Sequence, residues 1–216
     1  MNMFLDFDIT IFDLVRFMND LRGVLRTHGV SQELIDAYYS RSNPRIEDTT
    51  SKTHYLIQNP DEMGRILETE KVDKIMTAWK EIIASGNKYV FPDALFFLEK
   101  YSHENLIVVS YSSPVWQSLK IDISGTRRYF KDIFIVRGPK SVALKDCNEG
   151  GPLDGIFVDD RARYIDDIKA NFPEIVVFHM LRPNGRYNHE RPTVDHVIVS
   201  GFGEVDKHIQ NHIPQS

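Results

Sequence analysis

The sequence of 216 residues contains a single cysteine, Cys147, which excludes a disulfide framework within the chain and any cysteine-rich zinc module. It also has no excess of basic residues, because 26 lysines and arginines stand against 31 aspartates and glutamates, a net charge of -5. A general nucleic-acid-binding protein needs a basic surface. We therefore expect no nucleic-acid partner.

Long hydrophobic runs are missing as well. No stretch approaches the roughly 18 apolar residues of a membrane helix, and the N-terminus reaches Asp6 without the apolar segment of a signal peptide. We therefore expect a cytoplasmic protein with no membrane partner. Hydrophobic residues make up 42% of the chain and charged residues 26%, which is ordinary for a globular protein and excludes disorder or a collagen-like fibre.

Short apolar runs predict six buried strands. Each run is rich in β-branched or aromatic residues and lacks strict alternation, as expected for strands covered on both faces of a parallel sheet. Segments of helical length separate the later runs, which favours an α/β fold with a Rossmann-like, doubly wound parallel sheet. The predicted strands are residues 3–5, 106–109, 133–136, 156–158, 175–178 and 197–199.

The long segment between the first two predicted strands contains only helical patterns. Apolar residues at helical spacing predict helices over residues 14–25, 34–38 and 72–83, and the polar stretch 41–52 predicts a loop. This pattern indicates an all-helical insertion after the first strand. We therefore expect two domains, which are an α/β core of residues 1–12 and 90–216 and a helical cap of residues 13–89.

The sharpest functional signal follows the first predicted strand, at Asp6, Asp8 and Thr10. Both carboxylates would lie at the carboxyl edge of the sheet, where open α/β folds bind ligands. Two like charges this close repel each other and need a counter-ion, for which a hard divalent cation such as Mg2+ is suited. Aspartate is also a competent nucleophile towards phosphorus. The alternative is a strand end that only caps the next helix.

Three further strand ends or helix starts carry polar side chains. Asp159 and Asp160 follow a predicted strand and would supply oxygen ligands for Mg2+, unless they form an acidic turn. Ser110 follows another strand and could hydrogen-bond a phosphoryl oxygen, although serine is also an ordinary helix N-cap. Lys140 opens a predicted helix and could neutralise a phosphoryl group, with Lys145 as the competing lysine.

Two weaker signals lie near the C-terminus. His208 and His212 are one helical turn apart, a spacing that suits a metal, but a surface pair is the simpler interpretation. Residues 182–186 are rich in turn-forming types and could touch a substrate, although an exposed loop is the simpler expectation.

In this order the four main signals resemble the motifs of the haloacid dehalogenase superfamily. These motifs are a strand followed by Asp-x-Asp-x-Thr, a strand ending in Ser or Thr, a lysine that opens a helix, and a strand that ends in a paired or spaced set of acids. The resemblance covers essentially the whole chain, and the helical insertion is similar to that family's C1-type cap. One departure is Ile9, where family members often have glycine.

The resemblance implies a Mg2+-dependent phosphatase that hydrolyses a small phosphomonoester through an aspartyl phosphate. It would make Asp6 the nucleophile and a metal ligand. Asp8 would act as general acid and then base, and its backbone carbonyl would contribute to the metal site. Asp8 also argues against the dehalogenase branch of the family, which usually lacks this second carboxylate.

The same resemblance assigns the remaining site residues. Thr10, Ser110 and Lys140 would bind the phosphoryl group. Asp160, together with Asp159, would hold the metal. Two alternatives keep these residues but change the outcome: a phosphotransferase or mutase that passes the phosphoryl group to a second hydroxyl, and a catalytically silent protein that binds phosphate esters. Substrate specificity would lie on the cap, whose polar loop offers four candidate side chains, Arg41, Arg45, Lys52 and His54.

Overall fold

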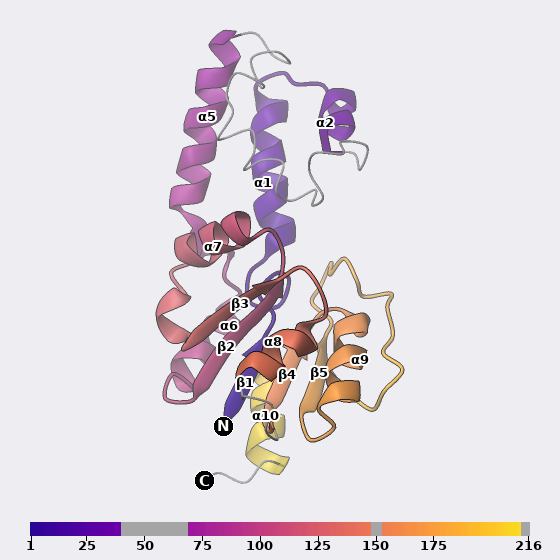
Figure 1. Ribbon diagram of the computed structural model, residues 1–216. Coiled ribbons are helices and arrows are strands. Elements are labelled where there is room, and N and C mark those ends of the chain that lie inside the picture. The colour runs from indigo at the N-terminus through magenta and orange to yellow at the C-terminus, as the bar shows by residue number, and fades with distance from the viewer. Residues whose placement is uncertain (40–68, 148–152, 213–216) are drawn as a thin grey trace.

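A computed structural model of the chain describes residues 1–39, 69–147 and 153–212. Within them, one parallel sheet is flanked by helices, and a layer of long helices rises from the end of the sheet at which the strands point (Figure 1). The strands follow the order β3-β2-β1-β4-β5-β6, and every neighbouring pair is parallel. This confirms the predicted doubly wound α/β class. The strands are β1 (Asn2–Leu5), β2 (Asn105–Tyr111), β3 (Asp132–Val136), β4 (Ile156–Asp159), β5 (Val176–Met180) and β6 (Val197–Val199).

The register of the central strands brings their carboxyl ends to one edge. Leu5 of β1 pairs with Val108 of β2 on one side and with Val158 of β4 on the other. The next residue, Asp6, continues the pattern, because its backbone N–H donates to the carbonyl of Val158 at 2.9 Å. Residues that follow these three positions therefore emerge close together.

Helices cover both faces of the sheet, and side chains of the central strands alternate between two hydrophobic clusters. Phe4 packs into the cluster that includes α8 and α9, whereas Leu5 packs into the cluster on the opposite face. Figure 1 shows α8 and α9 on the near face. The helices of this region are α6 (Pro92–Lys100), α7 (Pro114–Ile123), α8 (Lys140–Cys147), α9 (Ala162–Asn171) and α10 (Phe202–His212), with a short 3-10 helix η2 (Arg127–Tyr129).

The region between β1 and β2 is helical where it is described, as the periodicity predicts. It contains α1 (Leu14–Thr27), α2 (Gln32–Tyr39), α5 (Thr69–Ala84) and the 3-10 helix η1 (Gly86–Tyr89). The buried indole N–H of Trp79 in α5 donates to the carbonyl of Leu21 in α1 at 2.8 Å, which ties the two long helices together. The division of the chain at residues 12–13 and 89–90 stays a prediction.

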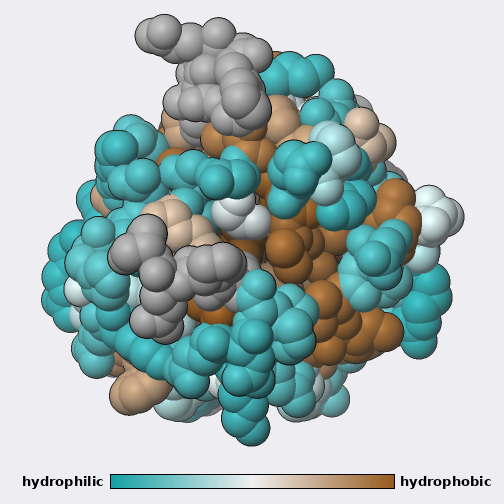
Figure 2. All heavy atoms as spheres, turned by 90° about the horizontal axis from the view of Figure 1, so that it is seen from below, coloured by the Kyte–Doolittle hydropathy of each residue, from teal (hydrophilic) through white to brown (hydrophobic). Residues whose placement is uncertain are grey.

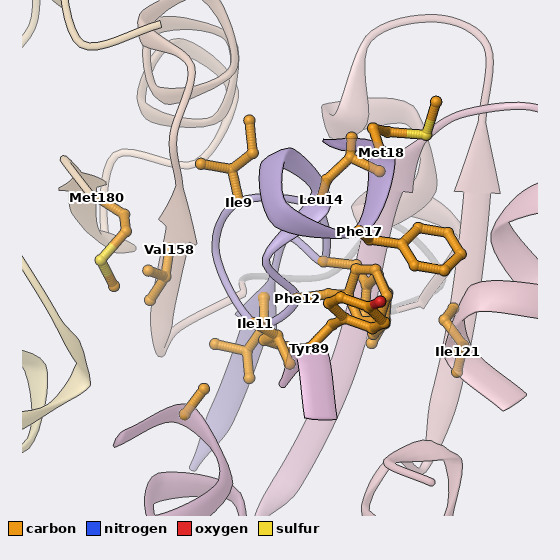
Figure 3. Close-up of a cluster of buried hydrophobic side chains, with 14 of the residues drawn as sticks. Ile9, Ile11, Phe12, Leu14, Phe17, Met18, Tyr89, Ile121, Val158 and Met180 are labelled. Atoms are coloured by element: carbon orange, nitrogen blue, oxygen red, sulfur yellow. The ribbon is translucent and has the colours of Figure 1, made fainter. Parts of the chain in front are cut away.

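Two chain segments run side by side where the helices leave the sheet. The N–H of Asp13 donates to the carbonyl of Tyr89 at 2.7 Å, and that of Phe91 donates to the carbonyl of Ile11 at 3.0 Å. Figure 3 shows the rings of Phe12, Phe17 and Tyr89 gathered at this junction. The aromatic packing fixes the start of α1 directly beyond the Asp6–Thr10 motif.

The face of the molecule seen from below is mainly hydrophilic, with a hydrophobic area that extends from its middle to the right of the view (Figure 2). Among the described helices, none has the length and apolar character needed to cross a bilayer. The large hydrophobic side chains exposed on the described surface are those of Leu34, Phe96, Tyr111, Val115, Val142 and Ile198.

Candidate active site

Three carboxylates converge at the carboxyl edge of the sheet. Asp6 directly follows β1, Asp159 ends β4, and Asp160 follows it. One carboxylate oxygen from each lies within 4.8 Å of the others, and all three side chains are buried. Buried like charges at this spacing strongly favour binding of a proton or a cation. The sequence therefore placed Asp6, Asp159 and Asp160 correctly at one edge.

Lys140 supplies one positive charge to this carboxylate cluster. It is the first residue of α8 and is fully buried. Its Nζ donates to Asp6 Oδ1 at 2.5 Å and to Asp159 Oδ2 at 2.6 Å. Burial alone would lower the pKa of Lys140, but the two carboxylates outweigh it and hold the pKa above its usual range. Lys145 is exposed and donates instead to Asn171 at 3.0 Å.

The carboxylate cluster keeps an unbalanced negative charge despite Lys140. Burial raises the pKa of Asp159 to about 7, with Lys140 opposing the shift and Asp6 adding to it. Burial also raises the pKa of Asp160 well above its ordinary value, and the charges of Asp6 and Asp159 act in the same direction. Because three carboxylates share one buried ammonium group, a divalent cation would complete the charge balance.

Two hydroxyls and one carboxylate oxygen at this edge are buried without a hydrogen-bond partner among the described residues. They are Thr10 Oγ1, Ser110 Oγ and Asp160 Oδ2. A buried polar atom left unpaired costs roughly 1–3 kcal/mol. A metal ion at Asp160 and an anion at the hydroxyls would supply the missing interactions. The donor set therefore fits Mg2+ together with a phosphoryl group.

Asp8 is not part of the carboxylate cluster and has a different lysine as its partner. Its carboxylate binds Lys120, a fully buried residue of α7, whose Nζ donates to Oδ1 at 2.6 Å and also to Oδ2. Sequence reasoning missed Lys120. The available signal was its position on the buried face of α7, one turn after Trp116. A lysine on that face needs a buried anionic partner.

Solved structures with this architecture provide the comparison with known proteins. A protein from Burkholderia xenovorans LB400, described as a haloacid dehalogenase-like hydrolase, has a TM-score of 0.73 at 17% identity and covers 99% of this chain and 98% of its own. The L-2-haloacid dehalogenase of Xanthobacter autotrophicus, with chloropropionic acid covalently bound, has a TM-score of 0.61 at 15% identity, with 98% of each chain covered. The chain has the haloacid dehalogenase-like fold.

A magnesium-bound hydrolase from Bacillus subtilis has the same fold, with a TM-score of 0.60, 12% identity, and 97% of this chain and 98% of that chain covered. No family model matches the sequence. No curated protein matches it either. The likeness to the haloacid dehalogenase-like fold is therefore carried by the three-dimensional structure.

Ile9 adopts a backbone conformation that favours glycine. Its φ is 64°, in the left-handed region, where a β-branched residue is strained. The backbone turns here between Asp8 and Thr10, and the N–H of Ile9 donates to the carbonyl of Phe12 at 2.7 Å. The Ile9 side chain is buried, which offsets the strain with hydrophobic contact.

Arg182 corrects one expectation, because the start of the 182–186 stretch is buried rather than exposed. Its Nη1 donates to both carboxylate oxygens of Asp93, at 2.9 and 2.7 Å, and its Nη2 donates to the carbonyl of Thr10 at 3.0 Å. A guanidinium is suited to this forked geometry. Arg182 therefore anchors the loop that follows β1.

The remaining sequence candidates lie away from this site or outside the described residues. The imidazole rings of His208 and His212 stack on each other, with their centroids 4.4 Å apart. The carboxylate cluster is the only group of three or more potential metal ligands found in residues 1–39, 69–147 and 153–212. The cap candidates Arg41, Arg45, Lys52 and His54 lie outside the described residues.

Proposed function

We propose that the chain is a hydrolase of the haloacid dehalogenase superfamily and, within it, a Mg2+-dependent phosphatase of small phosphomonoesters. The observation that carries this proposal is the buried contact of Lys140 with both Asp6 and Asp159. It brings together the carboxylate that we propose as nucleophile, a carboxylate that we propose as metal ligand, and the cation that we propose to bind phosphate. The unpaired hydroxyls of Thr10 and Ser110 add donors for a phosphoryl group.

In the proposed first step, an oxygen of Asp6 attacks phosphorus and forms a bond to it while the bond to the leaving oxygen breaks. Asp8 takes up a proton in place of its ion pair with Lys120 before this step, and it gives that proton to the leaving alcohol. In the second step Asp8 takes a proton from water, the water oxygen attacks phosphorus, and the bond to Asp6 breaks to release phosphate. Lys140, Ser110 and Thr10 hold the phosphoryl oxygens throughout.

The metal would be held by the carboxylates of Asp6, Asp159 and Asp160 together with the backbone carbonyl of Asp8. A bound Mg2+ supplies charge neutralisation for the phosphoryl group. The unpaired Asp160 Oδ2 and the raised pKa of Asp160 support this assignment, because both indicate a missing positive charge.

Asp8 favours phosphate ester hydrolysis over halide displacement. A halide leaves without needing a proton, whereas an alkoxide is a poor leaving group unless an acid protonates it. The ion pair between Asp8 and the buried Lys120 holds this carboxylate in place two residues beyond Asp6.

The decisive experiment measures phosphate release from p-nitrophenyl phosphate and a panel of metabolite phosphoesters, with Mg2+ or with a chelator. We expect turnover that needs Mg2+ and that Asp6→Asn abolishes. Asp73→Asn, on the exposed surface of α5, is the matched control and should retain full activity. Halide release from 2-chloropropionate without any phosphate release would show that the protein is a dehalogenase and not a phosphatase. No turnover of either class of substrate would refute the proposal that it is a hydrolase.

A further inference from the structure

An open pocket of about 360 Å3 lies at the carboxyl edge of the sheet. We call it the arginine–tyrosine pocket. Ligand pockets in proteins commonly have volumes of about 300–1,000 Å3. Its principal lining side chains are those of Tyr111, Arg137, Pro139, Arg163, Tyr164 and Asp167.

The arginine–tyrosine pocket is built on the same chain segments as the candidate active site. Tyr111 directly follows Ser110, and Pro139 directly precedes Lys140. The ring of Tyr164 connects the two sites, because its centroid is 4.7 Å from Lys140 Nζ. A ligand in the pocket would therefore contact the Tyr164 ring, which itself lies next to Lys140.

The lining combines flat rings with positive charge. The Arg163 guanidinium lies over both tyrosines, with Cζ 4.5 Å from the centroid of Tyr164 and 5.3 Å from that of Tyr111. It donates one N–H to the Tyr164 hydroxyl, whereas a guanidinium carries five donors in all. Arg137 contributes a second positive charge, and Tyr111 is 46% exposed.

The one acidic residue of the lining, Asp167, leaves an excess of positive charge, because the lining holds two arginines. Both oxygens of the Asp167 carboxylate accept hydrogen bonds from Ser141, one from its backbone N–H at 2.9 Å and one from its hydroxyl at 2.7 Å. Asp167 therefore accepts hydrogen bonds from the first turn of α8. The two arginines and the exposed tyrosine ring define the chemistry that the cavity offers to a ligand.

We propose that the arginine–tyrosine pocket binds a planar, negatively charged group, whose ring packs on Tyr111 and whose charge pairs with Arg163 and Arg137. Arginine and aromatic side chains together recognise such groups through ion pairing and stacking. The group is either the far end of the phosphomonoester substrate or a separate aromatic anion. Only the first of these sources rests on the proposed phosphatase function.

Binding is tested first without catalysis, by titrating benzenesulfonate into the chelator-treated protein in a calorimeter. We expect binding that exceeds that of methanesulfonate, which lacks the ring, and of benzamide, which lacks the charge. Arg163→Gln should weaken binding roughly tenfold or more, because it removes hydrogen bonds to a charged group. Tyr111→Ala should weaken binding about tenfold, because it removes the ring on which the ligand stacks. Both side chains are exposed or near the surface, and thermal melting checks that the variants fold.

Arg128→Gln is the matched control variant. Arg128 also lies over a tyrosine ring, at 4.8 Å from Tyr129, and donates to its hydroxyl at 2.8 Å, but it does not line the pocket. Its loss should leave benzenesulfonate binding unchanged. Equal binding by wild type and folded Arg163→Gln, or no binding by the wild type, would overturn the proposal.

Kinetics then separate the two sources of the ligand. If the pocket holds part of the substrate, Arg163→Gln should raise the KM for 4-carboxyphenyl phosphate about tenfold and leave acetyl phosphate unchanged, and benzenesulfonate should compete with the aryl substrate. If the ligand is separate, benzenesulfonate and the aryl phosphate should bind together without competition. Intact benzenesulfonate binding with no turnover of any ester would refute the phosphatase but support the pocket.

Discussion

Lys120 of α7 and Asp8, 112 residues apart in sequence, form an ion pair beside the catalytic candidates. The lysine is fully buried, and the Asp8 side chain is 18% exposed. The ammonium group contacts both oxygens of the carboxylate and so restricts its rotation. Lys120 is therefore the positioning residue for the proposed acid and base.

The first prediction concerns Lys120→Met. Without the lysine, Asp8 should lose its fixed orientation, and proton transfer contributes about 10²–10⁴-fold to such reactions. We expect kcat to fall by a large part of this factor for glycerol 2-phosphate, whose leaving group needs a proton, and much less for p-nitrophenyl phosphate. Lys74→Met, on the exposed side of α5, is the control. Equal losses on the two esters would show that Lys120 acts only on stability.

The second prediction tests the strain at Ile9. Glycine is normally less stable than alanine by roughly 0.5–1 kcal/mol within regular structure, but a left-handed conformation costs a residue with a side chain about 1–2 kcal/mol. Ile9→Gly should therefore be more stable than Ile9→Ala in urea unfolding, although both lose the buried side chain. At buried Ile11, whose φ is not positive, the order should reverse. If the alanine variant is more stable than the glycine variant at both positions, Ile9 is not strained.

The third prediction separates the two candidate lysines. Lys140→Met should lower kcat/KM by about 10²–10³-fold, comparable to the loss of one donor in a preorganised anion site. Lys145→Met should have no effect, since Lys145 contacts Asn171 at the surface. Steady-state kinetics with p-nitrophenyl phosphate measure both. A Lys145 variant that loses activity while the Lys140 variant keeps it would reverse the assignment.

The fourth prediction follows from the raised pKa of Asp159, from its ordinary 3.8 to about 7. The folded protein binds this proton more tightly than the unfolded chain, so its stabilising contribution is full below pH 3.8 and is lost as the pH rises through about 7. In the presence of chelator, Asp159→Asn should therefore gain Tm relative to wild type between about pH 4 and 7. Each kcal/mol corresponds to about 2–4 °C in a chain of this size.

Mg2+ provides the control for the pH prediction. At pH 7 the cation should raise the Tm of wild type more than that of Asp159→Asn, because it replaces the proton on the carboxylate cluster. Asp73→Asn, which is exposed on α5, should follow wild type in both conditions. A Tm difference between Asp159→Asn and wild type that stays constant across this pH range would show that Asp159 has no raised pKa in the folded protein.

The sequence by itself determined the α/β class, the positions of the strands, and the meeting of Asp6, Ser110 and Asp159 at one edge. The reason is local. A parallel sheet aligns the carboxyl ends of its strands, so residues at the end of each apolar run must emerge together. The register of Leu5 with Val108 and Val158 shows this directly.

Only the tertiary structure decided which distant side chains complete that edge. Lys145 looks like an ordinary lysine of an amphipathic helix, and Arg182 looks like part of a turn. The position of Lys120 one turn after Trp116 indicates burial but does not indicate its partner. Their partners are set by how each element packs against the sheet, which brings Lys120 to Asp8 and Arg182 to Thr10 across 112 and 172 residues. Local sequence carries the strand and helix periodicity. An ion pair between distant elements forms only when both elements pack in place, so neither side chain reveals its partner in the sequence.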